Sequence, residues 1–369
     1  MRKFFLAAAV FALAACSQKT EAPAPVETPE PIGVSTAHEL PSVGFSPTGI
    51  DFWTHPNVAF NALIIVAGAD GIVSYNMEDG VEVSRVPGVN AHGAAVSYLG
   101  LGPTARGLLV SYDTEAEAFK VYAIDNVTRN FQPELGEIPV RGNVRSFCFG
   151  RAAGESSPSL FIVQKGELTS YDFGIEAENV KVSNMQSFTA PADATDCTVD
   201  PLTGEAIVVT QAGALYRFAS EGAPSAITTL ANVKPAGIGM IASASEGENG
   251  EAAFGAHVFL LGGETGAVAV IDAPSGKVAG AASFAATDEI DAEGAPGVLG
   301  VSGANLGGLY RNGAVAVTFG SEAPALRLIP ANGVANALGI ETGDPIEPRG
   351  TLPEAEDDSL LIRTDFNLE

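Results

Sequence analysis

The chain is poor in the residues that usually build metal centres or contact nucleic acids. Only three of its 369 residues are cysteine and four are histidine, and they are scattered without a CxxC pair. A zinc site of the common Cys/His kinds is therefore not expected. Lysine and arginine total 19 against 44 acidic residues, which gives a net charge of −25. Such a charge disfavours nucleic acid or an anionic lipid surface as a direct partner.

Long apolar runs are also lacking, with one short exception at the N-terminus. Arg2 and Lys3 precede an uncharged apolar run over residues 4–15. This run is shorter than the roughly 20 residues that span a bilayer, and it has the layout of a secretory signal peptide. It ends in Leu-Ala-Ala followed by Cys16, which resembles the lipobox of bacterial lipoproteins.

The lipobox resemblance implies how the chain is processed and where it resides. Residues 1–15 would be removed as a signal peptide, and Cys16 would carry acyl chains that give stable membrane anchoring. Because Ser17 rather than Asp follows the cysteine, the resemblance implies the outer membrane. A plain signal peptide cut by the ordinary peptidase is the alternative. Residues 16–44 are rich in proline and acid, so they predict an extended tether.

Helical periodicity is scarce, and its best instance is about one turn at residues 334–338. A short alternating strand recurs instead, usually opened by glycine and followed by a turn-rich tail. Its six instances start about 47 to 59 residues apart, at 71–75, 119–124, 166–171, 213–218, 266–271 and 325–329. Another apolar run precedes each, at 62–66, 107–111, 159–163, 206–210, 257–261 and 313–317. Each pair predicts a β-hairpin.

A period of about 50 residues with several strands and no helices predicts an all-β fold, a six-bladed β-propeller. One blade cannot bury both of its faces, so neighbouring blades stack around an axis. A large β-sandwich or a β-solenoid is the alternative, but the first would show no repeat and the second a shorter period. We expect one propeller domain over residues 45–345 and a C-terminal tail over residues 346–369.

Several short motifs, in this order and spacing, resemble the β-propeller phytases. Ile-Asp-Phe-Trp-Thr-His-Pro at 50–56, with the strands at 63–67 and 71–75, resembles the opening of that family. Later matches lie at 120–125, 195–200, 214–218, 293–300 and 328–340. The resemblance implies a calcium-dependent enzyme that removes phosphate from inositol hexakisphosphate by direct attack of water. Acidic side chains at one end of the channel would hold the Ca²⁺ ions that bridge protein and phosphate.

The resemblance carries over only part of that family's site. It assigns Asp51, Asp196 and Glu293 as metal ligands, and Asp196, Glu293 and Lys165 as catalytic residues. Most other positions of the family's site hold Ala, Gly, Ile or Thr, and His92 stands where the family has an acid. Several Ca²⁺ ions, at about six to eight oxygen ligands each, need more than three carboxylates. Alternatively, Asp51, Asp196 and Glu293 cap turns or are simply exposed to solvent.

Two functions therefore stay open for the mature chain. The first is Ca²⁺-assisted hydrolysis of phosphate monoesters of inositol phosphates. The second is a non-catalytic propeller that binds a ligand or a protein at the outer membrane. We expect a monomer with no nucleic-acid partner. The sequence has no Gly-x-Ser-x-Gly nucleophile motif and no phosphate-binding P-loop.

The two remaining cysteines lie at equivalent points of neighbouring repeats. Cys148 and Cys197 each occupy a short apolar strand. In an exported protein such a pair forms a disulfide or stays as two buried thiols.

Overall fold

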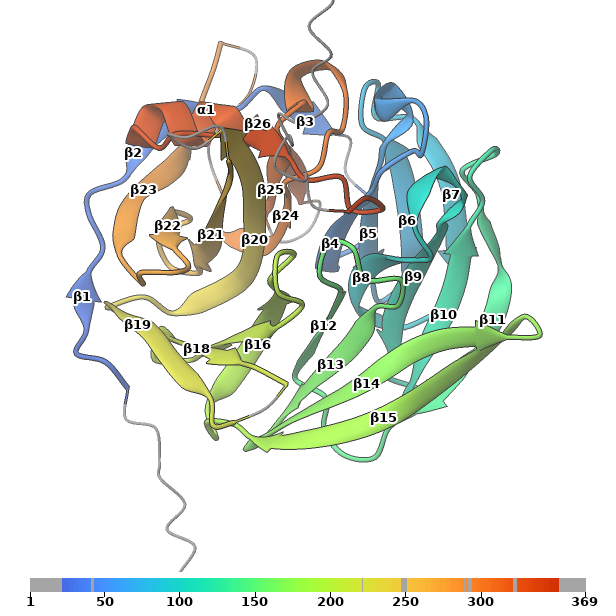
Figure 1. The fold of residues 1–369 in the computed structure, drawn as a ribbon. Helices are drawn as coiled ribbons and strands as arrows, with labels where there is room; N and C mark the ends of the chain where they lie inside the picture. Colours follow the sequence, from blue (N-terminus) through green and yellow to red (C-terminus); the bar gives the residue numbers. More distant parts are fainter. Residues whose placement is uncertain are drawn as a thin grey trace, which may run out of the picture.

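The computed structural model describes residues 22–40, 43–220, 222–246, 251–288, 290, 294–320 and 324–351. Six small sheets are arranged in a ring around a central axis (Figure 1). This arrangement confirms the six-bladed β-propeller that the repeat predicted. Within the described residues, no helix is both long and apolar enough to cross a membrane.

Each blade has four antiparallel strands that run from the axis outward. The innermost strands are β4 (Pro47–Trp53), β8 (Ala91–Leu99), β12 (Ser146–Gly150), β16 (Ala194–Val199), β20 (Pro235–Glu246) and β24 (Pro296–Ser302). The second strands are β5 (Leu63–Gly68), β9 (Arg106–Asp113), β13 (Ser159–Gln164), β17 (Ala206–Thr210), β21 (Ala252–Gly262) and β25 (Ala314–Phe319). The blades are numbered 1 to 6 in this order.

The third strands are β6 (Gly71–Asn76), β10 (Ala118–Ile124), β14 (Glu167–Glu176), β18 (Ala214–Phe218), β22 (Val268–Asp272) and β26 (Ala325–Pro330). Together with the second strands they form the repeated hairpins that the sequence predicted. The outermost strands are β7 (Glu82–Pro87), β11 (Phe131–Pro139), β15 (Asn179–Thr189), β19 (Ser225–Ala231), β23 (Val278–Ala285) and β3 (His38–Leu40).

The apolar runs of the second strands follow from the way the blades stack. Both faces of these strands are covered by neighbouring blades, so all residues of β5 and β25 are buried. The buried apolar side chains form six clusters, and each cluster lies between two adjacent blades. The core is therefore a ring of interfaces rather than one central core.

The two ends of the ring differ in the loops that they carry. We call the end where the innermost strands begin the entry face and the end where they finish the exit face. The exit face carries the loops after the innermost strands, which include three 3-10 helices, η1 (Ala59–Asn61), η2 (Gly102–Thr104) and η3 (Gly308–Tyr310). It also carries the turns between third and fourth strands.

An N-terminal strand closes the ring. β3 pairs antiparallel with β26 and so becomes the fourth strand of blade 6. Leu40 is buried there, and the Arg327 guanidinium donates to the Glu39 carboxylate at 3.0 Å. A strand near the start of the described chain, β3, therefore completes its last blade.

The segment predicted as a tether differs from that expectation in its described part. β1 (Val26–Glu27) pairs parallel with β19, and β2 (Ile32–Ser35) pairs parallel with β23. These short strands lie along the outer rim of blades 4 and 5 (Figure 1). Main-chain hydrogen bonds to an edge strand need no apolar side chains, so low hydrophobicity did not prevent this pairing. Cys16 lies outside the described residues, so its lipidation stays a prediction.

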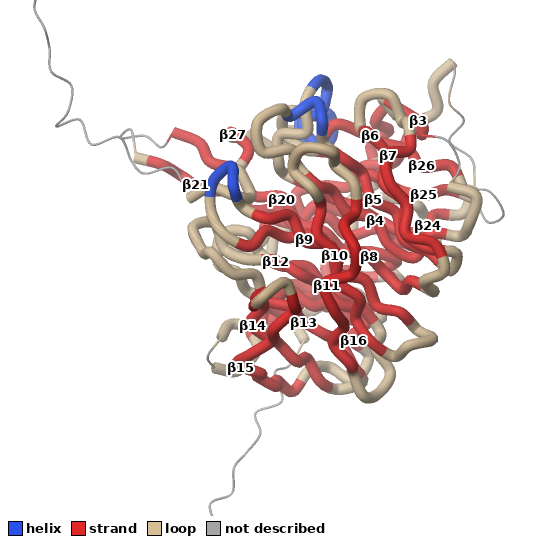
Figure 2. Tube along the Cα trace, turned by 90° about the vertical axis from the view of Figure 1, so that its right-hand side faces the viewer, coloured by secondary structure: helices blue, strands red, loops and turns tan. Residues whose placement is uncertain are grey.

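The first residues of the predicted C-terminal tail also pack on the ring. Helix α1 (Ala331–Leu338), which includes the predicted turn, ends at Gly339 with φ 65°. The chain then forms β27 (Asp344–Pro345), which pairs with β20 on the side of the ring shown at the left of Figure 2. Ile346 and Arg349 are buried. The domain therefore extends beyond residue 345.

Candidate functional site

The six innermost strands surround a channel of about 440 Å³ along the axis. Residues of every blade line it, and Ile346 and Pro348 of the C-terminal segment line its exit end. Two backbone hydrogen bonds fix that segment, from Gly102 N to Arg349 O at 2.9 Å and from Gly154 N to Gly350 O at 3.0 Å. The C-terminal segment therefore crosses the exit end of the channel.

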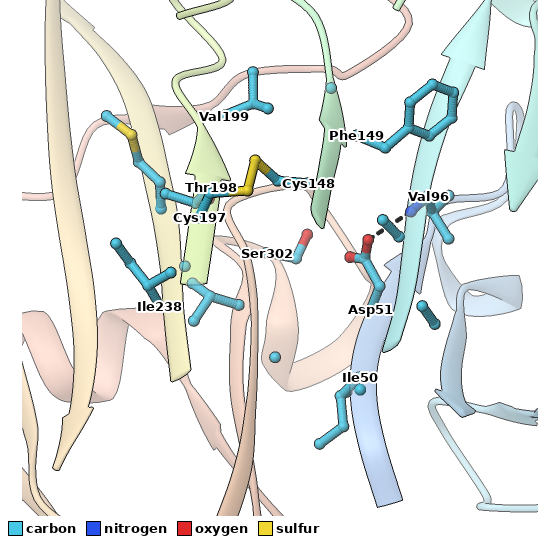
Figure 3. Close-up of a pocket in the computed structure, with 18 of the residues that line it drawn as sticks. Ile50, Asp51, Val96, Cys148, Phe149, Cys197, Thr198, Val199, Ile238 and Ser302 are labelled. Carbon is cyan, nitrogen blue, oxygen red and sulfur yellow. Dashed lines mark hydrogen bonds between the residues drawn. A yellow bond between two sulfur atoms is a disulfide. The ribbon is translucent and has the colours of Figure 1, made fainter. Parts of the chain in front are cut away.

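The channel wall is about half apolar and half polar. Ile50, Val96, Phe149 and Ile238 line it from four different blades (Figure 3). The hydroxyl groups of Thr198 and Ser302 add polar positions. Ser302 Oγ accepts from Ala304 N at 3.2 Å, which leaves its O–H free to donate. The wall thus combines apolar surface with hydrogen-bonding groups.

Among the described residues, Asp51 is one of two carboxyl groups that line the channel, and it links blades 1 and 2. Its Oδ1 accepts from Phe52 N at 2.7 Å, and its Oδ2 accepts from Val96 N of the next blade at 2.6 Å (Figure 3). Burial raises the pKa of Asp51 to about 7, although both backbone hydrogen bonds act to lower it. The group is thus partly protonated near neutral pH.

Asp196 plays the corresponding part between blades 3 and 4. The Ser146 hydroxyl of β12 donates to its Oδ1, which also accepts from Cys197 N at 2.8 Å. Burial raises the pKa of Asp196, while hydrogen bonds from Ser146, Cys197 and the Ile238 backbone, together with the charge of His92, act to lower it. The bond to the Ile238 backbone brings in blade 5 as well.

A disulfide joins the same two blades. Cys148 of β12 and Cys197 of β16 are bonded, with their Cα atoms 5.6 Å apart (Figure 3). Both residues are buried and line the channel. The bond closes a sequence separation of 49 residues, about one blade. It therefore fastens neighbouring innermost strands to each other.

Two basic side chains lie at the entry end of the channel wall. His92 Nε2 is 3.1 Å from Arg145 O, a contact between blades 2 and 3. Arg145 Nη1 donates to Ala192 O at 2.8 Å and to Ala194 O at 2.9 Å, in blade 4. Both side chains are therefore engaged in contacts between blades.

The predicted site residues are brought together only in part. Asp51 and Asp196 both line the channel. Lys165 is exposed in the turn between β13 and β14, away from the channel lining. Glu293 lies outside the described residues, so its assignment as a ligand or catalytic group stays a prediction.

Arg349 at the exit end was not found from the sequence. Its side chain is buried, with its guanidinium carbon 4.0 Å from the centre of the Tyr98 ring and 5.5 Å from that of Trp53. It donates to Thr54 Oγ1 and Thr54 O, and Glu347 Oε1 lies at 3.4 Å. A single arginine held by aromatic rings and carbonyl oxygens leaves no periodic pattern, so nothing in the sequence marks it.

The described donor set does not fit the calcium sites that the resemblance implied. Within the part of the chain that the structure describes, no three His, Cys, Asp or Glu side chains gather closely enough to hold a metal ion. The carboxylates of Asp51 and Asp196 already accept hydrogen bonds from neighbouring strands. Ca²⁺ needs several free oxygen ligands. We therefore propose no reaction that uses calcium at this site.

Comparisons with known proteins add little. No family model and no curated protein matches the sequence. One of the similar solved structures is a chain of the "Crystal structure of Nidogen/Laminin Complex", at 12% identity and a TM-score of 0.43. That match covers 65% of this chain and 81% of the other. The resemblance to phytases therefore stays a prediction.

Proposed function

We propose that this protein is a binding module whose central channel accepts one small molecule with both apolar and polar groups. The observation that carries this proposal is the channel itself. Its volume of about 440 Å³ lies within the roughly 300–1,000 Å³ usual for ligand pockets. Such pockets combine apolar surface with polar groups that fix the orientation of the ligand, and the channel wall offers both.

The polar groups of the wall define the ligand further. The Ser302 O–H can donate a hydrogen bond, and Thr198 of blade 4 adds a second hydroxyl group to the wall (Figure 3). Asp51 carries a proton part of the time near neutral pH. A multiply charged anion would meet an acidic protein, and the two arginines among the described residues of the channel wall, Arg145 and Arg151, already donate to carbonyl oxygens. A neutral molecule with one or two oxygen or nitrogen atoms suits this wall.

Phosphate ester hydrolysis is the competing hypothesis from the family resemblance. Because the resemblance assigns Asp51 and Asp196 to the site of such an enzyme, this hypothesis is tested as well. The contacts of Asp51 and Asp196 support a structural role instead, because both carboxyl groups join innermost strands of different blades.

A neutral fluorescent amine, 1-aminoanthracene, tests the binding proposal. We would titrate it into protein that lacks residues 1–15 and carries Cys16→Ser. We expect one saturable site, and we expect it to be lost in Ser302→Trp, because an indole at this position fills the channel. The matched control Ser220→Trp changes an exposed turn and should bind normally. Unchanged binding in a folded Ser302→Trp variant would overturn the channel as the site.

Phosphate release decides the competing hypothesis. Phytate and p-nitrophenyl phosphate are incubated with the same protein, with and without Ca²⁺. We expect no phosphate release and no Ca²⁺-dependent rise in melting temperature, since a ligand that binds the folded state would raise it. Release that needs both Ca²⁺ and Asp196 would establish the enzyme instead.

A further inference from the structure

The C-terminal segment at the exit end of the channel spans the width of the ring. We call residues 344–350 the strap. At its start, β27 pairs with β20 of blade 5, and the buried Ile346 packs into the cluster between blades 4 and 5. At its end, the N–H groups of Gly102 in blade 2 and Gly154 in blade 3 donate to Arg349 O and Gly350 O. Blades 2 and 5 lie opposite each other in a ring of six, so the strap crosses the axis (Figure 1).

Arg349 fixes where the strap lies. Its guanidinium stacks on the Tyr98 ring of blade 2 and donates to Thr54 Oγ1 and Thr54 O at the end of β4 in blade 1. Tyr98 Oη in turn accepts from Thr54 N at 2.8 Å, so the partners of Arg349 also hold each other. A planar guanidinium that stacks on a ring and donates in two directions has both its position and its angle fixed.

Arg151 holds the middle of the strap. It directly follows β12 of blade 3 and is buried. Its Nη2 donates to Pro348 O and its Nη1 to Gly100 O, both at 2.8 Å. The side chain of Glu347, by contrast, is 55% exposed. The strap therefore turns Glu347 to solvent, while Ile346 and Pro348 on either side of it line the channel.

The two ends of the channel differ in polarity. His92, Arg145 and Asp196 come from the first residues of innermost strands or from just before them, so they line the channel toward the entry face. At the exit end, the guanidinium of Arg151 already donates to carbonyl oxygens, and the strap contributes Ile346 and Pro348. A molecule with one polar and one apolar end therefore fits with its apolar end against the strap.

We propose that the strap limits the length of the molecule that the channel accepts. Ile346 and Pro348 meet the apolar end of that molecule, and Arg349 is the residue that positions them. This inference rests on the proposed function of the channel. A longer molecule could enter fully only by displacing the strap, which would expose Ile346 and break the hydrogen bonds of both arginines. The favoured class is a neutral molecule with a short apolar part.

Displacement of 1-aminoanthracene by straight-chain primary alcohols tests this inference. The protein that lacks residues 1–15 and carries Cys16→Ser is titrated with alcohols of increasing chain length. Affinity should rise by about fourfold with each methylene until the chain reaches the strap, and should then stay level. Ile346→Ala leaves space at the exit end, so the rise should continue for about two more methylenes.

Two negative results of this titration have different meanings. The same length limit in the parent and in folded Ile346→Ala would overturn the inference and leave the channel as a ligand site. Absence of saturable probe binding to the parent would overturn the channel as a ligand site, and the inference with it.

Arg349→Ala tests the positioning role with a measurement that needs no ligand. Trp53 is the only tryptophan of the chain, and its ring lies 5.5 Å from the guanidinium carbon of Arg349. Quenching of its fluorescence by acrylamide therefore reports whether the strap is in place. We expect about threefold stronger quenching in Arg349→Ala, because release of the strap opens this region to solvent. The length limit should disappear in the same variant.

Three further variants complete the test. Arg349→Lys keeps the charge but not the planar fork, so it should fall between the parent and Arg349→Ala in both measurements. Ile346→Ala should move the length limit and leave the quenching unchanged. Arg311→Ala is the matched control, since Arg311 is exposed on the same face. Stronger quenching in Arg349→Ala with an unchanged length limit would overturn the inference, and unchanged quenching would overturn the positioning role of Arg349.

Discussion

The inner wall of the ring is built in two different ways. Around blades 1 to 4, polar groups bind across from one blade to the next. Asp51 reaches Val96, Arg145 reaches Ala194, and Ser146 reaches Asp196. Around blades 5 and 6, the innermost strands β20 and β24 consist mainly of Gly, Ala, Ile, Val and Leu.

Close packing holds the second region together. A Cβ added at Gly237 or Gly239 of β20 would lie 2.7 or 2.5 Å from the Cβ atoms of Leu299 or Val301 of β24. Only glycine allows the two strands to approach so closely. The comparison teaches that acids on a propeller's inner wall need not be remnants of a catalytic site. In blades 1 to 4 they add hydrogen bonds to glycine packing, because a Cβ at Gly49 would lie 2.6 Å from Ala94 N and one at Gly150 2.7 Å from Val199 Cβ.

Removing the disulfide should have the largest effect on the polar region. A cross-link over a separation of 49 residues stabilises by about 4 kcal/mol in the chain-entropy description. We therefore expect Cys148→Ala with Cys197→Ala to lower the free energy of unfolding by about this amount in urea titrations. The single variant Cys197→Ala should lose as much. Stability equal to that of the parent would show that hydrogen bonds alone hold blades 3 and 4 together.

Adding a methyl group to the closely packed strands of blades 5 and 6 should have the second largest effect on stability. Gly239→Ala places a methyl group against Val301, so we expect a loss of about 2–3 kcal/mol from overpacking. Gly255→Ala is the matched control, because its new Cβ would meet only Ser243 Oγ, at 3.8 Å. Thermal unfolding of both variants measures the difference. Equal stability of the two would mean that β20 and β24 separate easily, against the comparison drawn above.

Truncating one acid of the polar region should cost slightly less. Asp196→Ala leaves Ser146 Oγ and Cys197 N without their partner, which typically costs about 1–3 kcal/mol. Asp193→Ala, in the exposed turn before β16, should have no measurable effect. Urea unfolding of both variants measures the difference in the free energy of unfolding. A stable Asp196→Ala variant would contradict the linking role.

The smallest effect concerns pH. The pKa of Asp51 is about 7 in the folded state and 3.8 is its ordinary value, so the folded state binds more protons between these values. Its contribution to stability is therefore full below pH 4 and falls as the pH rises to 7. Asp51→Asn removes this dependence. Between pH 4.5 and 7.5, the free energy of unfolding of the variant should rise by about 1 kcal/mol relative to that of the parent. This value allows for the water in the channel, which screens the charge.

Melting temperatures of Asp51→Asn and the parent across this range provide the measurement. Taking the difference between the two proteins cancels the titration of the other acids. A difference that stays constant with pH would show that Asp51 titrates normally and that its burial carries no electrostatic cost.

The architecture was predictable because its signal is repeated six times. Each hairpin combines a buried second strand with a tight turn, as at β5 and β6, where Gly71 has φ 132° and a Cβ there would strike Val86 O. Such residues recur with the blade and need no knowledge of distant contacts. The recurrence of these hairpins therefore specified strand type and blade count.

The contacts of the two chain ends could not be read in the same way. β1 and β2 pair through main-chain groups, which every sequence possesses, so Val26 and Ile32 gave no sign of their partners. Arg349 depends on rings that lie some 250 to 300 residues earlier, at Trp53 and Tyr98. The roles of Asp51 and Asp196 likewise became clear only when their cross-blade partners were known.

The pairing of β3 with the last blade affects how the molecule folds. Glu39 meets Arg327 across 288 positions of sequence, so the strand synthesised near the start waits for the hairpin made near the end. Until then β26 presents an open edge, which invites pairing with other chains. Assembly with such distant partners is slow. A recombinant protein begun after residue 40 would keep that edge permanently, and its failure in solution would be aggregation rather than unfolding.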